Sequence, residues 1–119
     1  MDINNLVVKF CVEGTQAEFH QQMDIACGLY QKAWESAQDA YEACIAAHYV
    51  ARGQDSPAEK LHWNQVALDK ANEVGDDRVR EFYPSLYLNM GQSHELLGNR
   101  KEAKRYYELA ARLGLNHQT

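Results

Sequence analysis

The sequence predicts an all-α protein, and three observations lead to this fold class. Apolar residues recur with the three- and four-residue spacing of an amphipathic helix along most of the chain, and no segment alternates for long in the manner of a strand. Only two prolines occur, so long helical stretches are uninterrupted. Small and aromatic residues also return at fixed offsets, which is typical of stacked helix pairs.

Length and composition are those of one ordinary globular domain, which we expect to cover residues 1–119. The chain has 119 residues, of which 45% are hydrophobic and 24% are charged. The net charge of −5 argues against a general nucleic-acid binder. From Gly98 to the end, however, five basic residues meet two acidic ones, so this segment is either a solvated helix face or a docking surface for an acidic partner.

The cysteines and the lack of targeting signals favour a cytoplasmic protein. Cys11, Cys27 and Cys44 are odd in number and widely spaced, with no CxxC pair, so we expect reduced thiols in the core. The first residues lack the basic start and the long apolar run of a signal peptide. No segment approaches the roughly 20 apolar residues of a membrane span, so no membrane partner is expected.

The first two predicted helices occupy the N-terminal third of the chain. The run NLVVKFCV could form a strand, but its apolar residues have helical spacing, and nothing nearby could pair with a lone strand. Gly14 lies either inside this helix or at its end, in which case Thr15 to Glu18 would form a fresh capping box. An apolar stripe from Met23 to Trp34 predicts the second helix.

The middle two predicted helices are bounded by capping signals. Ser36 with Asp39 resembles a capping box, so we expect the third helix to start there. The stretch GQDSPAEK is the clearest boundary, because Ser56 is an N-cap residue and Pro57 suits the first helical position. The fourth helix should stop at VGDD, with Gly75 as the C′ residue.

The last two predicted helices follow an irregular start. Asp76 or Asp77 would cap the fifth helix. Pro84 removes one backbone hydrogen bond if that helix begins at Asp77, so we expect a kinked or two-part start. The helix should continue to Leu97 and be followed by a Gly-Asn turn, and a last helix should cover about 100–113.

A repeated pattern of small and aromatic residues connects these helices. In two copies a glycine is followed at offsets of 12, 16 and 19 by alanine, tyrosine and alanine: Gly14, Ala26, Tyr30 and Ala33, and Gly91, Ala103, Tyr107 and Ala110. A middle copy starts at Ala46 and has Ala58 at offset 12, but its aromatic residue, Trp63, comes one position late. We expect the small residues to allow close helix packing, so that a side chain at Gly91 would push Ala103 away. The shared offsets also favour Gly14 inside a helix.

This pattern resembles the tetratricopeptide repeat over nearly the whole chain. The third copy is the most complete, with Tyr87, Met90, Gly91, His94, Gly98, Ala103, Tyr107 and Ala110 at the motif positions. The first copy departs from the motif at Glu13, where a large apolar residue is usual, and at Gln21, where glycine is usual. The resemblance implies a right-handed superhelix of about three antiparallel helix pairs, an α-solenoid, with repeats at about 5–36, 37–75 and 77–113. More distantly, the chain is similar to small uncharacterised bacterial proteins of this family, which bring no assigned activity.

No motif in the sequence indicates an enzyme, a metal site or a cofactor. Neither GxGxxG nor GxxxxGK[ST] nor HExxH occurs. Cys44 and His48 have the spacing of a helical metal-ligand pair, but a core cysteine beside a surface histidine is the simpler interpretation. They could also form a nucleophile pair, but no third, orienting group is evident. His94 stands where the repeat has an aromatic residue, which favours core packing.

The resemblance implies a binding surface on the first helix of each pair, which lines the concave face. The candidate residues on this face are Ser85, Leu88, Asn89, Gln92 and Glu95, with His48 and Arg52 alongside. Asn89 matches an asparagine that often bonds the backbone of an extended peptide, although it could equally cap a neighbouring helix. Cationic residues that would clamp a terminal carboxylate are missing from the matched positions.

These observations predict a non-enzymatic interaction module that binds a peptide or protein partner on its concave helical face. Two alternatives remain at this point. The protein could be a structural homo-oligomer such as a homodimer, because stacked pairs end in open apolar faces. It could also be an accessory protein that handles a small ligand or RNA.

Overall fold

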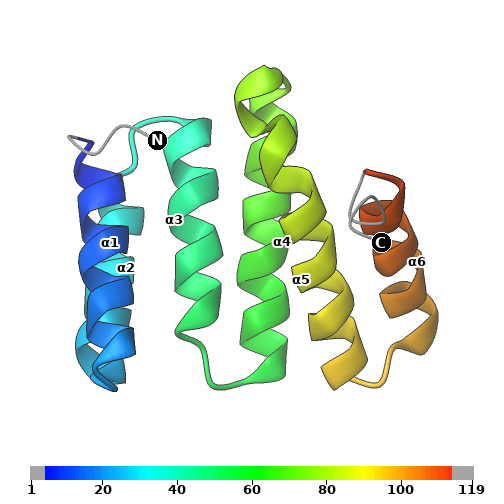
Figure 1. Cartoon of the computed structure of the whole chain (residues 1–119), viewed down its shortest axis with the longest axis horizontal. Helices are drawn as coiled ribbons and strands as arrows, with labels where there is room; N and C mark the ends of the chain where they lie inside the picture. Colours follow the sequence, from blue (N-terminus) through cyan, green and yellow to red (C-terminus); the bar gives the residue numbers. More distant parts are fainter. Residues whose placement is uncertain (1–4, 114–119) are drawn as a thin grey trace.

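Six α-helices form the protein in the computed structural model, which describes residues 5–113 (Figure 1). The helices are α1 (Leu6–Phe19), α2 (Met23–Ser36), α3 (Ala40–Arg52), α4 (Pro57–Val74), α5 (Tyr83–Leu96) and α6 (Arg100–Arg112), and a 3-10 segment, η1 (Asp77–Phe82), precedes α5. They pack as adjacent antiparallel pairs, α1 with α2, α3 with α4 and α5 with α6. No strand occurs within residues 5–113, so the N-terminal apolar run is helical and the all-α prediction is confirmed.

The start of α3 differs from the sequence prediction. Ser36 does not cap this helix, because it is still the last residue of α2, and the chain then turns to extended backbone at Ala37. The N-cap is Asp39, whose carboxylate accepts a hydrogen bond of 2.8 Å from the backbone amide of Glu42. Glu42 in turn accepts from the amide of Gln38 at 3.0 Å, so two amides at the start of the helix are satisfied reciprocally.

Most of the other predicted helix ends are confirmed. The hydroxyl of Ser56 accepts from the amide of Glu59 at 3.4 Å, and Gly75 ends α4 with a φ of +64°. Asp76, rather than Asp77, caps η1. The two-part start expected at Pro84 is also present, because η1 ends before α5 begins at Tyr83. Helix α5 ends at Leu96, one residue earlier than expected.

Two glycines inside helices allow a close approach between partners in a pair. A Cβ at Gly14 would lie 2.3 Å from the ring of Tyr30, and a Cβ at Gly91 would lie 2.6 Å from the ring of Tyr107. Gly14 is therefore a packing position within α1, not a helix stop. The expectation that Gly91 opposes Ala103 is wrong, because the nearest atoms belong to the tyrosine ring 16 positions along the chain.

The first and third pairs repeat the same structure. Helices α1 and α5 are both 14 residues long, and their first residues lie 77 positions apart. In each pair the tyrosine hydroxyl donates a hydrogen bond of 2.6 Å to a glutamate, from Tyr30 to Glu18 and from Tyr107 to Glu95. The turn after the first helix has a positive φ at the same position in both, +62° at Gln21 and +80° at Gly98.

An aromatic contact joins the first and second pairs, and Trp34 packs against all three buried clusters of the interior. The rings of Trp34 in α2 and Trp63 in α4 meet edge to face, with their centroids 5.1 Å apart.

Two of the three cysteines lie in the protein interior, since Cys11 and Cys44 are buried free thiols, as expected. Burial raises the pKa of Cys11 to about 12 and that of Cys44 to about 11, which keeps both thiols neutral. The third cysteine, Cys27, is only partly buried.

Candidate binding groove

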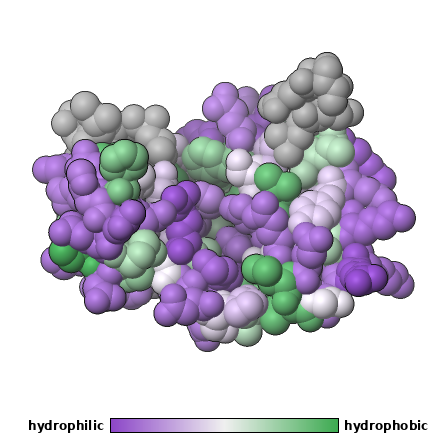
Figure 2. Space-filling model, turned by 60° about the horizontal axis from the view of Figure 1, so that its bottom comes forward, coloured by the Kyte–Doolittle hydropathy of each residue, from purple (hydrophilic) through white to green (hydrophobic). Residues whose placement is uncertain are grey.

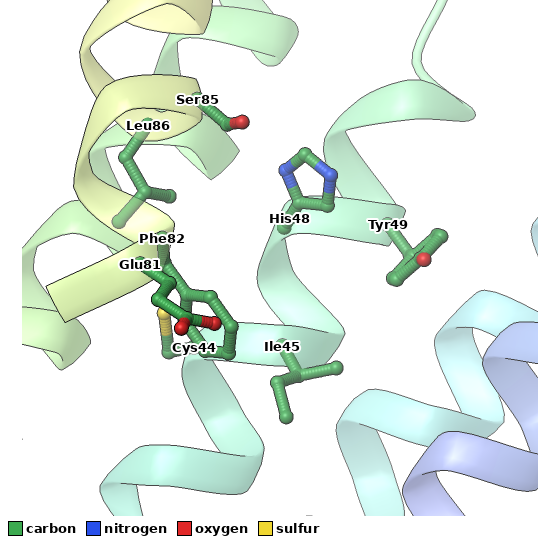
Figure 3. Close-up of a pocket in the computed structure, with 8 residues that line it drawn as sticks. All are labelled: Cys44, Ile45, His48, Tyr49, Glu81, Phe82, Ser85 and Leu86. Carbon is green, nitrogen blue, oxygen red and sulfur yellow. The ribbon is translucent and has the colours of Figure 1, made fainter. Parts of the chain in front are cut away.

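Two adjoining cavities lie between α3 and α5. The first encloses about 200 Å³, and its lining consists of four residues of α3, two of η1 and two of α5 (Figure 3). The second encloses about 270 Å³ and is lined by α3, α4 and α5. His48 lines both cavities, so together they form one groove, which we name the α3–α5 groove.

The helix packing explains why the groove lies at this place. Helix α4 packs closely against both α3 and α5, whereas α3 and α5 approach each other less closely. Helices α1 and α3, by contrast, are in direct contact. The segment η1 closes one end of the gap, because the ring of Phe82 stacks on Tyr41 of α3 with their centroids 5.9 Å apart. The groove is therefore a space left between the first helices of the second and third pairs.

The first cavity is mainly apolar. Ile45, Phe82 and Leu86 supply aliphatic and aromatic surface, and Figure 3 shows them on opposite sides of the space. Glu81 is the carboxylate among its lining residues, and it lies on the exposed surface. Such a space suits one apolar side chain of a ligand.

Seven of the nine residues that line the second cavity are polar or charged, and its lysine and arginine already have partners. The amide of Asn64 donates a hydrogen bond of 2.9 Å to the hydroxyl of Ser93, and both side chains are buried. The ammonium group of Lys60 lies 3.5 Å from two carbonyl oxygens in the last turn of α3, where the helix dipole favours a positive charge. Arg52 forms a two-bond contact with Glu18 of α1. The side-chain amide of Gln92 is exposed and makes no hydrogen bond within the part of the chain that the structure describes.

A hydrogen bond crosses the groove where the two cavities meet. Asn89 Nδ2 of α5 lies 3.3 Å from His48 Nδ1 of α3, and Asn89 donates when that nitrogen carries no proton. Burial, assisted by the nearby charge of Arg52, lowers the pKa of His48 below its ordinary value. The imidazole is therefore neutral at neutral pH and can accept this bond.

Five of the seven candidate residues from the sequence line the groove. His48, Arg52, Asn89 and Gln92 line the second cavity, and Ser85 lines the first. Asn89 caps no helix among the described residues, since its side chain bonds His48.

Leu88 and Glu95 line neither cavity. Leu88 is half-buried, and Glu95 accepts the hydrogen bond from Tyr107. Sequence reasoning missed Lys60, Asn64 and Phe82, which come from α4 and η1 rather than from the first helix of a pair. The unusually long GDDRVREFYP segment was the one signal that could have pointed to η1.

The described residues contain no group of three or more His, Cys, Asp or Glu side chains that could hold a metal ion. Cys44, His48 and Glu81 line the same cavity, but they do not form a group that could share a metal ion. None of the helices in residues 5–113 has the length and apolar character needed to cross a membrane. Comparisons with known proteins return no match to this chain among family models, curated proteins or solved structures.

Proposed function

We propose that this protein is a non-enzymatic interaction module whose α3–α5 groove binds an extended segment of a partner protein. The observation that supports this proposal is the pair of adjoining cavities with different chemistry, one apolar and one rich in side-chain amides. A space that combines an apolar site with a few polar groups suits a peptide, because a peptide presents side chains and backbone groups together.

The two cavities would bind different parts of the segment. An apolar side chain would enter the first cavity and contact Ile45, Phe82 and Leu86. Full burial of such a side chain contributes about 1.5–3 kcal/mol. The backbone of the segment would exchange hydrogen bonds with the amides of Asn89 and Gln92 in the second cavity.

We further propose that the helix pairs continue in the right-handed superhelix of a tetratricopeptide-type solenoid, in which α1, α3 and α5 line one concave face. The repeated glycine–tyrosine contact in the first and third pairs supports this proposal. A cytoplasmic location is consistent with the buried free thiols of Cys11 and Cys44.

Peptide display with groove variants tests the proposed function. Peptides selected on the full chain would be measured against Ser85→Trp, which fills the rim of the first cavity, and against Asn89→Ala/Gln92→Ala, which removes the amides of the second. Each variant should weaken binding about tenfold or more. The matched control is Gln16→Ala/Gln31→Ala, which removes two exposed amides from the first pair. Selected peptides that bind all these variants equally well would rule out the groove as the binding site.

A further inference from the structure

Helix α3 covers the side of the first helix pair that faces the second pair. Arg52 donates to both oxygens of Glu18, with bonds of 3.2 and 2.6 Å. Tyr49 packs on the ring of Tyr30 with their centroids 5.4 Å apart, and Val50 belongs to the same buried cluster. As a result Tyr30 is 0% exposed.

The third pair has the same groups without such a cover. Tyr107 donates to Glu95 as Tyr30 donates to Glu18, but Tyr107 is half-buried and Glu95 is exposed. No lysine, arginine or histidine in residues 5–113 forms an ion pair with Glu95. Leu88 occupies the position that Cys11 holds in the first pair, where α3 leaves Cys11 only 2% exposed, yet Leu88 is half-buried. We name Leu88, Glu95 and Tyr107 the C-terminal edge.

Two possible occupants of this edge fit it poorly, namely the residues that follow Leu113 and a second copy of the protein. The six residues after Leu113 contain no lysine or arginine, so they cannot supply the counterpart of Arg52. A second copy stacked head to tail would bring α1, whose exposed side chains include the apolar Leu6, Val12 and Phe19 beside polar residues such as Lys9 and Glu13. Helix α1 contains no arginine, however, so it lacks the planar two-bond partner that Arg52 gives to Glu18.

We propose that the C-terminal edge docks an amphipathic helix of another protein, which brings an arginine to Glu95 and an apolar stripe to Leu88 and Tyr107. The template for this contact is present in the protein itself, because α3 packs on the first pair in the way that we propose for the docked helix. The planar guanidinium suits a carboxylate that can accept two bonds, and the exposed Glu95, which has no ion-pair partner among residues 5–113, supplies the charge complementarity.

The position of the arginine in the docked helix follows from α3. Arg52 is the last residue of α3, and the thiol of Cys27 donates a bond of 3.2 Å to the carbonyl of Gly53, just beyond the helix end. Lys104 stands in the third pair where Cys27 stands in the first, and it is exposed. Its ammonium group is suited to bond the last carbonyls of a helix. The docked helix should therefore end beside Lys104 and carry its arginine in the last turn.

Selection of helical peptides tests the edge. A displayed library of helical peptides would be panned on the full chain, and the enriched peptides should share an arginine in the last turn. Glu95→Gln should weaken their binding roughly fivefold to tenfold, and Glu95→Lys should weaken it further. The matched control is Glu13→Gln, which removes an exposed carboxylate from α1 and should change nothing.

A charge swap distinguishes this contact from others. An enriched peptide with its arginine replaced by glutamate should lose binding to the wild type and regain it with Glu95→Arg. The variant Asn89→Ala/Gln92→Ala should bind these peptides with wild-type affinity. The groove proposal and the edge proposal can therefore fail independently of each other. The proposal would be overturned if no peptide is enriched, or if the affinity of the enriched peptides is the same for the wild type and the Glu95 variants. It would also be overturned if scattering mass shows self-association that Glu95→Lys abolishes, because the occupant would then be a second copy.

Discussion

The first and third helix pairs carry the same glycine, glutamate and tyrosine in the same register, but within residues 5–113 only the tyrosine and glutamate of the first pair are covered by a further helix. The pKa of Tyr30 is raised to about 12, first by burial and then by its bond to Glu18. The pKa of Tyr107 is also raised to about 12, but there the bond to Glu95 is the main cause. The tyrosine of this contact is thus fully buried in the first pair and partly exposed to solvent in the third.

This comparison separates two sources of structure. The register within a pair depends on the glycine–tyrosine approach, which is too close for a Cβ in both pairs. The burial of the tyrosine depends on whether a following pair packs on it, as α3 packs on Tyr30. Substitutions at matched positions should therefore have unequal effects in the two pairs.

The largest expected effect comes from filling the glycine positions. Gly14→Leu should lower the free energy of unfolding by about 3 kcal/mol or more, because the fully buried ring of Tyr30 has no space to move into. Gly91→Leu should be severe but smaller, about 2 kcal/mol, because the half-buried Tyr107 can turn toward solvent. Urea unfolding followed by circular dichroism measures both.

Gly28 is the matched control for these substitutions. A Cβ at Gly28 meets no atom within 4 Å, so Gly28→Leu should stabilise the protein by up to about 1 kcal/mol through helix propensity. A melting temperature of Gly14→Leu within about 2 °C of wild type would contradict the proposed packing role.

A smaller effect should separate the two glutamates. Hydrogen bonding to Arg52 lowers the pKa of Glu18 below its ordinary value of 4.5. Glu18→Gln should therefore cost about 1 kcal/mol at pH 7, whereas Glu95→Gln should cost less because no cation in residues 5–113 pairs with Glu95.

The pH dependence of this cost has a definite sign. A carboxylate whose pKa is lowered in the folded state stabilises the protein above the pKa of the unfolded state, and the stabilisation is lost as the pH falls through the folded pKa. The stability difference between wild type and Glu18→Gln should thus be full above about pH 4.5 and shrink at lower pH. Unfolding curves at several pH values measure it, and a difference that persists in strong acid would count against the ion pair.

The smallest effect should come from the turn after the first helix of each pair. Gln21 has a φ of +62°, a region that suits glycine, and Gly98 holds the same position in the third pair. Gln21→Gly should stabilise the protein by about 0.5–1 kcal/mol, and Gly98→Gln should destabilise it by about 1 kcal/mol. Thermal melts of the two variants measure these changes. Melting temperatures that shift in the same direction for both variants would contradict a shared backbone conformation in the two turns.

Local chemistry explains which parts of the fold could be predicted. Ser56 and Gly75 mark helix ends through their own backbone and side-chain preferences, so sequence alone located them, and it narrowed the next N-cap to Asp76 or Asp77. Ser36 misled the prediction because serine and aspartate cap equally well, and only the course of the chain after α2 decides between them.

Contacts between elements were harder to predict. The repeat offsets indicated that Gly91 faces its partner helix, but not that the contact atoms belong to Tyr107 rather than to Ala103. The first-helix register likewise found five of the twelve α3 and α5 residues that line the groove. It could not find Asn64 or Phe82, because α4 and η1 reach the groove only through tertiary packing.

The edge-to-face contact of Trp34 and Trp63 has a practical consequence for measurement. The chain contains two tryptophans, and both lie at the junction of the first and second pairs. Tryptophan fluorescence, excited at wavelengths that tyrosine does not absorb, therefore reports mainly on that junction, whereas circular dichroism senses all six helices. Coincident transitions by the two signals would mean that the chain unfolds as one unit, and separate transitions would mean that the third pair melts on its own.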